Sequence, residues 1–273
     1  MRHIDGLAVL APSYRGLIVD LWGVIHDGVA PYAGALDCLR QLRERGMPVV
    51  LLSNAPRRAH AAAAGLATMG IGPELYDMVM TSGEATWRAL AAYAGAAIYH
   101  LGPPRDLSVI EGHSITLARD PRDARLFLNT GPDDSRDPTH IGEYLPELAA
   151  CLDAGLTMLC ANPDLEVMRG GQRLICAGAL AQRYVADGGA VRWIGKPFPE
   201  VYDPVFAHLN LPRWDVLAVG DALRTDIAGA AAVGVDALWV LSGIHGHTDP
   251  QAAVAEAQAA GLAPIATIPG CVW

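Results

Sequence analysis

Residues 17–28 read LIVDLWGVIHDG, and this stretch decides how the whole chain is interpreted. Its first five letters, LIVDL, form a short and largely apolar run, which is typical of a strand covered on both faces of a parallel sheet. The run carries Asp20 to its carboxyl end, and Trp22 follows two positions later. Ligands of open parallel sheets bind outside the carboxyl ends of the strands, so Asp20 is predicted to lie at a ligand-binding edge.

Buried strands and helices alternate on both sides of a middle region. The apolar spacing predicts these further elements, in order: helix 34–46, strand 48–54, helix 57–70, helix 199–209, strand 215–220, helix 225–234 and strand 235–243. Such a βαβα order implies a parallel sheet with right-handed crossovers.

The middle region has a different composition. It contains two loops rich in proline and acidic residues, 102–106 (GPPRD) and 131–138 (GPDDSRDP), and strands of its own at 126–130 and 157–162. We therefore expect a second domain to be inserted into the first.

These patterns give a definite fold class, α/β, with a Rossmann-like doubly wound parallel sheet as the core and a second α/β domain inserted into it. The expected limits are 1–97 for the first part of the core, 98–190 for the inserted domain and 191–273 for the second part of the core. A length of 273 residues and a hydrophobic content of 52% are sufficient for two such cores.

Composition excludes several classes of partner. The net charge of −9 leaves no basic surface for a polyanion, so binding to nucleic acid or to an anionic membrane is not expected. No apolar run approaches the roughly 20 residues of a membrane span, and residues 1–16 lack the features of a signal peptide, which predicts a cytoplasmic protein. The five cysteines are odd in number and widely spaced, and are predicted to be small core residues rather than disulfide or zinc ligands.

Polar groups follow three of the predicted core strands, namely Asp20, Ser53 with Asn54, and Asp221, and a GKP segment lies at 195–197. Each has an ordinary explanation when taken singly, as a turn residue or a helix cap. Together they would place two carboxylates, a hydroxyl and a cation at one edge of the sheet. A carboxylate is already ionised at pH 7, so it attacks a phosphoryl group without a base, provided that the anionic phosphate is neutralised.

The neutralising groups are also present in the sequence. Mg²⁺ held by carboxylates, with an ammonium beside it, would supply most of the catalysis of phosphoryl transfer, and hard oxygen ligands select magnesium over zinc. Of the 20 basic residues, 19 are arginine, and the single lysine, Lys196, falls in the GKP segment. A compact ammonium on a flexible stem suits a phosphate.

The motifs that carry these groups resemble the haloacid dehalogenase superfamily, and within it the class IIA phosphatases, which are NagD-like and 4-nitrophenylphosphatase-like. The matching motifs are DLWGV at 20–24, the strand-end Ser53-Asn54, the GKP segment and GDALRTDI at 220–227, and CANPD at 160–164 is similar to the TNPD segment of class IIA caps. The resemblance covers nearly the whole chain, and it implies a C2-type cap.

The resemblance also implies a role for each matching residue. Asp20 would form an aspartyl-phosphate, Ser53 and the main chain of Asn54 would hold phosphate oxygens, and Lys196 would pair with the phosphate and with Asp20. The metal would be bound by Asp20, Asp221, Asp226 and the main-chain carbonyl of Trp22. From the cap, Asn162 and Asp164 would approach the site, and the GPDD loop could touch the leaving group. The implied partner is a small phosphorylated metabolite; a homodimer is one outcome for the oligomeric state, since cap-mediated dimers occur among relatives.

Position 22 departs from the family pattern, which has a second aspartate there. In the family that residue protonates the leaving oxygen and then activates water, and an indole can do neither. General acid–base help is typically worth about 10²–10⁴ in rate, so weakened catalysis is expected unless water or His26 replaces the aspartate. Two alternatives remain open: a different reaction on this scaffold, of the dehalogenase or phosphonatase type, or a non-catalytic protein that binds a phosphate ligand.

Overall fold

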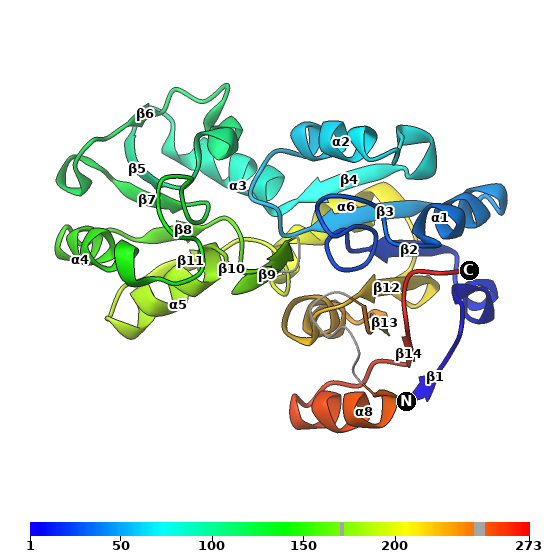
Figure 1. Ribbon diagram of the computed structural model, residues 1–273. Coiled ribbons are helices and arrows are strands. Elements are labelled where there is room, and N and C mark those ends of the chain that lie inside the picture. The colour runs from blue at the N-terminus through cyan, green and yellow to red at the C-terminus, as the bar shows by residue number, and fades with distance from the viewer. Residues whose placement is uncertain (170–171, 243–248) are drawn as a thin grey trace.

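The computed structural model describes residues 1–169, 172–242 and 249–273 (Figure 1). Its strands are β1 Arg2–His3, β2 Gly16–Val19, β3 Val49–Ser53, β4 Met78–Thr81, β5 Ala97–Leu101, β6 Thr116–Leu117, β7 Leu126–Asn129, β8 Met158–Cys160, β9 Glu166–Arg169, β10 Gln172–Ile175, β11 Val191–Trp193, β12 Val216–Gly220, β13 Asp236–Val240 and β14 Ala266–Ile268. Its α-helices are α1 Ala35–Glu44, α2 Ala59–Thr68, α3 Ser82–Leu90, α4 Leu145–Asp153, α5 Ala177–Ala186, α6 Asp203–Leu209, α7 Ala228–Val233 and α8 Pro250–Ala259.

The larger sheet has seven parallel strands in the order β1-β14-β13-β12-β2-β3-β4. From β2 the chain first runs outward through β3 and β4, and it later runs in the other direction through β12, β13 and β14. The order therefore reverses between β2 and β12, and the carboxyl ends of these two strands form the switch point where such sheets bind ligands. Asp20 follows β2 and Asp221 follows β12, so both reach this point.

Both faces of this sheet are covered, which explains why its strands are continuously apolar. Leu17 and Val19 of β2 pack on one face with residues of α1, such as Leu39. Ile18 packs on the opposite face, in a cluster that includes Val205 of α6. A strand with a helical layer on each side has no solvent face, so every position selects an apolar side chain.

A second sheet of five parallel strands, in the order β11-β8-β7-β5-β6, is built from residues 97–193. Helices α4 and α5 cover one of its faces around Phe127, while α3 contributes Leu90 to the cluster on the other face. Strands β9 and β10 form a separate antiparallel pair, which lies between the two sheets (Figure 1). We propose that the second sheet and this pair form the cap; the sequence suggests limits of 98–190, and strands β5 and β11 extend the sheet to 97–193.

The α/β class and the doubly wound sheet predicted from the sequence are confirmed, and the cysteines are free and buried as expected. The helix expected over 225–234 differs, because a π-helical turn occupies Leu223–Ile227 before α7 begins. The strand expected over 235–243 ends at Val240, and its last predicted residue, Gly243, lies outside the described residues. None of the helices in the described part of the chain has the length and apolar character needed to cross a bilayer.

Candidate active site

Three buried carboxylates meet at the switch point of the larger sheet. Asp20, Asp221 and Asp226 each offer an oxygen that lies within 4.8 Å of the oxygens of the other two. Two glycines permit this approach: a Cβ on Gly23 would lie 2.1 Å from Asp221 Oδ2, and one on Gly220 would lie 2.1 Å from Asp226 Cβ. The glycines of the DLWGV and GDALRTDI motifs are thus required by the carboxylates beside them.

Lys196 is the cation of this cluster. Its Nζ donates to Asp20 Oδ1 at 2.5 Å, to Asp226 Oδ1 at 2.7 Å and to the carbonyl of Leu52 at 2.9 Å, and its side chain is only 4% exposed. Burial lowers the pKa of Lys196, but the two carboxylates outweigh burial and raise that pKa above its ordinary value. The lysine is therefore fully charged at neutral pH.

The cluster has more negative than positive groups, since three carboxylates face one ammonium. Burial raises the pKa of Asp20 to about 7, against the opposing charge of Lys196 and with a contribution from Asp226. A further cation would balance this excess of negative charge. Closely spaced carboxylate oxygens are the ligands that Mg²⁺ selects, so the donor set fits magnesium.

The π-helical turn explains how Asp226 enters the cluster. The amides of both Asp226 and Ile227 point to the carbonyl of Ala222, at 2.9 and 3.2 Å, which inserts one extra residue into the turn. In this conformation Asp226 Oδ2 accepts the amide of Ala222 at 3.1 Å while Oδ1 accepts from Lys196. Single π-turns often occur at functional sites, and this one carries the carboxylate of Asp226.

Ser53 and Asn54 lie at the end of β3, beside the cluster, and both are buried. The side chain of Asn54 grips the main chain of Lys196: Oδ1 accepts its amide at 2.8 Å and Nδ2 donates to its carbonyl at 3.1 Å. Ser53 Oγ accepts the amide of Ala55 at 3.2 Å, so its hydroxyl proton can be directed to a ligand. The sequence assigned only the main chain of Asn54 to this site. The structure shows that the side chain of Asn54 also fixes the main chain at Lys196.

The two predicted residues of the CANPD segment behave differently. Asp164 reaches the site, because its Oδ1 accepts from Asn54 Nδ2 at 2.9 Å, and burial raises its pKa. The side chain of Asn162 is instead used in its own turn, where Oδ1 accepts the amide of Asp164 at 2.9 Å. In the GPDD loop, Asp133 and Asp134 form ion pairs with Arg136 and Arg105.

The side chain of Trp22 makes a contact that the sequence did not indicate. Its indole Nε1 donates to the main-chain carbonyl of Met168 in β9, at 2.8 Å. A carbonyl acceptor carries no residue-specific signal, so only the fold reveals this partner. The same holds for Arg224, which lies inside the GDALRTDI motif and donates to the carbonyl of Pro163 in the CANPD segment.

His26 is poorly suited to the acid–base role that the sequence suggested for it. The amide of Gly28 donates to His26 Nδ1 at 3.0 Å, so in the neutral ring the proton resides on Nε2. Burial lowers the pKa of His26 to about 4, an effect that the nearby Asp27 only partly opposes. A histidine with so low a pKa is a weak base at neutral pH, and we assign it a structural role in the turn at residues 26–28.

This assignment predicts a pH effect on stability. The unfolded chain binds a proton at His26 with a pKa near 6.5 and the folded chain only near 4, so the unfolded state holds more protons between these values. The free energy of unfolding should therefore fall as pH drops from 6.5 to 4, by up to about 3 kcal/mol from this residue. In His26→Asn, whose amide oxygen can still accept from Gly28, denaturant titrations should show a smaller loss; an unchanged loss would contradict the assignment.

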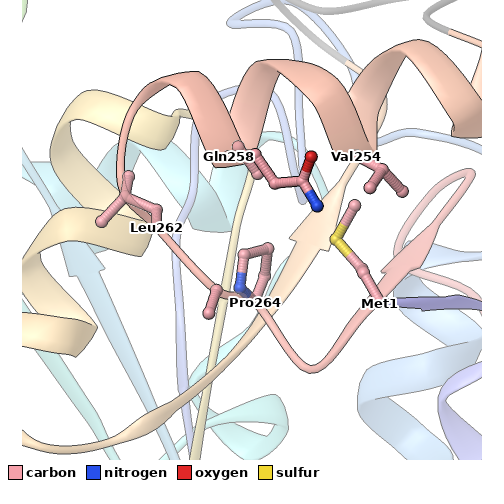
Figure 2. A pocket seen from close by; sticks show the side chains of 7 residues that line it. Met1, Val254, Gln258, Leu262 and Pro264 are labelled. Carbon is pink, nitrogen blue, oxygen red and sulfur yellow. The ribbon is translucent and has the colours of Figure 1, made fainter.

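A small hollow elsewhere is not a site of this kind. It has a volume of about 120 Å³ and is lined by Met1, Val254, Ala257, Gln258, Leu262, Ala263 and Pro264 (Figure 2). It lies against α8, and its lining offers neither a charged side chain nor a nucleophile. Phosphate chemistry therefore has no basis there.

Comparisons with known proteins identify a family of hydrolases that shares this sequence pattern and fold. Residues 17–116 match the family model described as haloacid dehalogenase-like hydrolase, and residues 193–264 match one described as HAD-hydrolase-like. A solved haloacid dehalogenase-like hydrolase from Brucella suis is 30% identical, superposes with a TM-score of 0.88, and is covered over 100% of its chain by 98% of this one. A 4-nitrophenylphosphatase from Thermotoga maritima, 24% identical with a TM-score of 0.74, has the same fold over 96% of each chain.

Two curated relatives carry functional names. D-glycerol 3-phosphate phosphatase of Mycobacterium tuberculosis is 31% identical over 88% of this chain, and the match spans 66% of that relative. Ribonucleotide monophosphatase NagD of Escherichia coli is 27% identical over 87% of this chain and 91% of its own length.

Proposed function

Because the chain belongs to the haloacid dehalogenase-like hydrolase family and is a phosphoric monoester hydrolase within it, we propose that it cleaves small phosphorylated metabolites through an aspartyl-phosphate on Asp20. The observation that carries the proposal is the buried cluster of three carboxylates around the single lysine of the chain. Neither a structural ion pair nor a binding pocket alone needs a carboxylate excess of this kind.

The proposed reaction has two steps. An oxygen of the Asp20 carboxylate attacks phosphorus, the bond from phosphorus to the ester oxygen breaks, and the alcohol leaves with a proton taken from solvent. Water then attacks the phosphorus of the acyl phosphate, which releases inorganic phosphate and restores the carboxylate. Ser53 and the main chain of Asn54 would bind the phosphate oxygens. Lys196, whose Nζ is hydrogen-bonded to Asp20, would pair with the phosphate as well and so keep it beside the nucleophile.

Mg²⁺ is the proposed cofactor, and it would offset the negative charge that accumulates between the phosphate and the carboxylates. Its proposed ligands are Asp20, Asp221, Asp226 and the main-chain carbonyl of Trp22. The side-chain oxygens of the three aspartates already lie within 4.8 Å of one another, which supports the assignment. Any residue supplies a carbonyl, so a tryptophan at position 22 is compatible with the metal site.

The same tryptophan affects which esters are cleaved. It has no transferable proton at neutral pH, and its N–H is already donated to Met168. No carboxylate at position 22 is available to protonate the leaving oxygen, so esters whose leaving groups are stable as anions should react fastest. We therefore propose a preference for good leaving groups, with slow turnover of simple alkyl phosphates.

The experiment that tests the proposal compares leaving groups with and without magnesium. With Mg²⁺, 4-nitrophenyl phosphate should be hydrolysed about 10²–10⁴ times faster than glycerol 3-phosphate at saturation, since general acid catalysis is worth that factor. Chelation by EDTA should remove both activities, and added Mg²⁺ should restore them. Release of inorganic phosphate is the measurement.

Variants at position 22 separate leaving-group chemistry from packing. Trp22→Asp should increase turnover of glycerol 3-phosphate more than Trp22→Phe does, because only aspartate adds a proton donor. Equal turnover of the two esters by the unmodified protein would contradict the leaving-group preference. Activity that survives EDTA would contradict the cofactor assignment.

A further inference from the structure

The indole of Trp22 is fixed at both of its ends. On one side its six-membered ring packs on the turn after β2: a Cβ on Gly28 would lie 2.2 Å from it, and the His26 ring stands edge-on with centroids 5.4 Å apart. On the other side its N–H donates to Met168 in β9. The side chain thus joins the loop that carries Asp20 to a strand 146 residues away in sequence.

Strand β9 needs such a support. It pairs with β10 in a two-stranded sheet that is separate from both larger sheets, and Figure 1 shows this pair between them. Its side chains are at most half-buried. An isolated pair of strands is marginally stable, so a contact from a well-packed loop contributes substantially to its position.

The position of β9 also matters for the proposed chemistry. Trp22 follows the proposed nucleophile by two residues, and the strand it holds begins two residues after Asp164, which contacts Asn54 at the site. These contacts bring β9 to the side of the site that carries Trp22 and Asp164, which is where we place the leaving group of an ester bound at Asp20.

We infer that Trp22 is a positioning residue that anchors β9 beside the site and thereby selects phosphates with small leaving groups. The inference rests on the proposed phosphatase function for its substrate class, but the anchoring itself does not depend on turnover. In this chain, position 22 has a hydrogen bond to strand β9 in place of a proton-transfer group.

Trp22→Phe tests the anchoring, because phenylalanine keeps a ring against Gly28 and removes the N–H. Amide hydrogen exchange of residues 166–169 should become about 2- to 10-fold faster, the factor expected for one net hydrogen bond. Exchange in β3 should not change. The matched control is Trp87→Phe, since Trp87 Nε1 also donates to a main-chain carbonyl at 2.8 Å, that of Glu111, away from the carboxylate cluster.

Kinetics test the selection. The ratio of kcat/KM for a ribonucleoside monophosphate to that for glycerol 3-phosphate should rise about 2- to 10-fold in Trp22→Phe, mainly through KM, and should stay constant in Trp87→Phe. Unchanged exchange in residues 166–169 would overturn the anchoring, and faster exchange with an unchanged ratio would overturn the selection. If the unmodified protein hydrolyses no phosphate at all, the proposed function fails, whereas the exchange result still decides the anchoring.

A measurement on the unmodified protein keeps the anchoring testable if Trp22→Phe does not fold. The indole N–H of Trp22 should exchange with solvent much more slowly than that of Trp214, whose side chain is 77% exposed. Equal rates for the two indoles would overturn the inference.

Discussion

Asp20→Asn is expected to abolish hydrolysis of every phosphate ester without unfolding the protein. Asparagine occupies nearly the same volume as aspartate but offers no nucleophilic carboxylate, and Lys196 keeps Asp226 as its partner at 2.7 Å. Removal of a covalent nucleophile elsewhere costs on the order of 10⁶ in kcat, so turnover should fall by several orders of magnitude. Phosphate release measured with Mg²⁺ present gives the result.

Two further observations make this test specific. Brief reaction with radiolabelled substrate followed by acid quenching should leave label on the unmodified protein, in a form removed by hydroxylamine, and none on Asp20→Asn. The matched control is Asp215→Asn, because the side chain of Asp215 pairs at the surface with the exposed Arg15 at 3.3 Å and should be dispensable. Asp20→Ala excludes recovery of activity by deamidation, and near-normal turnover in that variant would rule out Asp20 as the nucleophile.

Lys196→Met should produce the largest loss of stability of any single substitution at the site. Methionine fills a similar volume but leaves Asp20, Asp226 and the carbonyl of Leu52 without the ammonium that now binds all three. Removing one partner from a buried charge pair costs about 3–5 kcal/mol, because the remaining charge stays buried and unpaired. Urea denaturation in the presence of EDTA would measure this loss.

Magnesium should reduce the loss, and this links the stability test to the metal site. Without the ammonium the three carboxylates attract a divalent cation more strongly, so Mg²⁺ should raise the unfolding midpoint of Lys196→Met by more than that of the unmodified protein. The control is Arg183→Met, which removes the cation of an exposed helical pair with Asp187 at 2.7 Å and should cost less than about 1 kcal/mol. A loss in Lys196→Met as small as in this control would contradict the proposed charge balance.

Sequence patterns were sufficient for most of the fold and for the nature of the cluster. The uninterrupted apolar run before Asp20 and the run before Asp221 predicted neighbouring buried strands, and parallel strands bring their carboxyl ends to one edge. Lys196 is the single lysine of the sequence, which marked it as the candidate cation. The structure places the Nζ of Lys196 2.5 Å from Asp20 Oδ1.

Other parts of the site lie beyond such patterns because they depend on contacts between distant segments. The hydrogen bonds between the Asn54 side chain and the main chain of Lys196 join residues that are 142 apart in the sequence. Taken alone, each of the two residues is typical of a turn or a helix cap. The low pKa of His26 comes from its burial, which the polar letters around it do not indicate. The π-turn before α7 cannot be distinguished from an ordinary helix in the sequence, because one extra residue in a turn barely changes the spacing of the apolar residues.

The sequence by itself thus determined the α/β class, the strand-end carboxylates and the lysine, because local periodicity and strand direction fix which side chains reach the edge of a parallel sheet. Only the tertiary structure decided what Trp22 does. The family resemblance implies that an acid–base group is lost at this position, whereas the fold shows the N–H of Trp22 bound to a main-chain carbonyl in β9. A main-chain acceptor is the same chemical group in every residue, so a contact of this kind is specified by the path of the backbone and not by the identity of the residue that provides it.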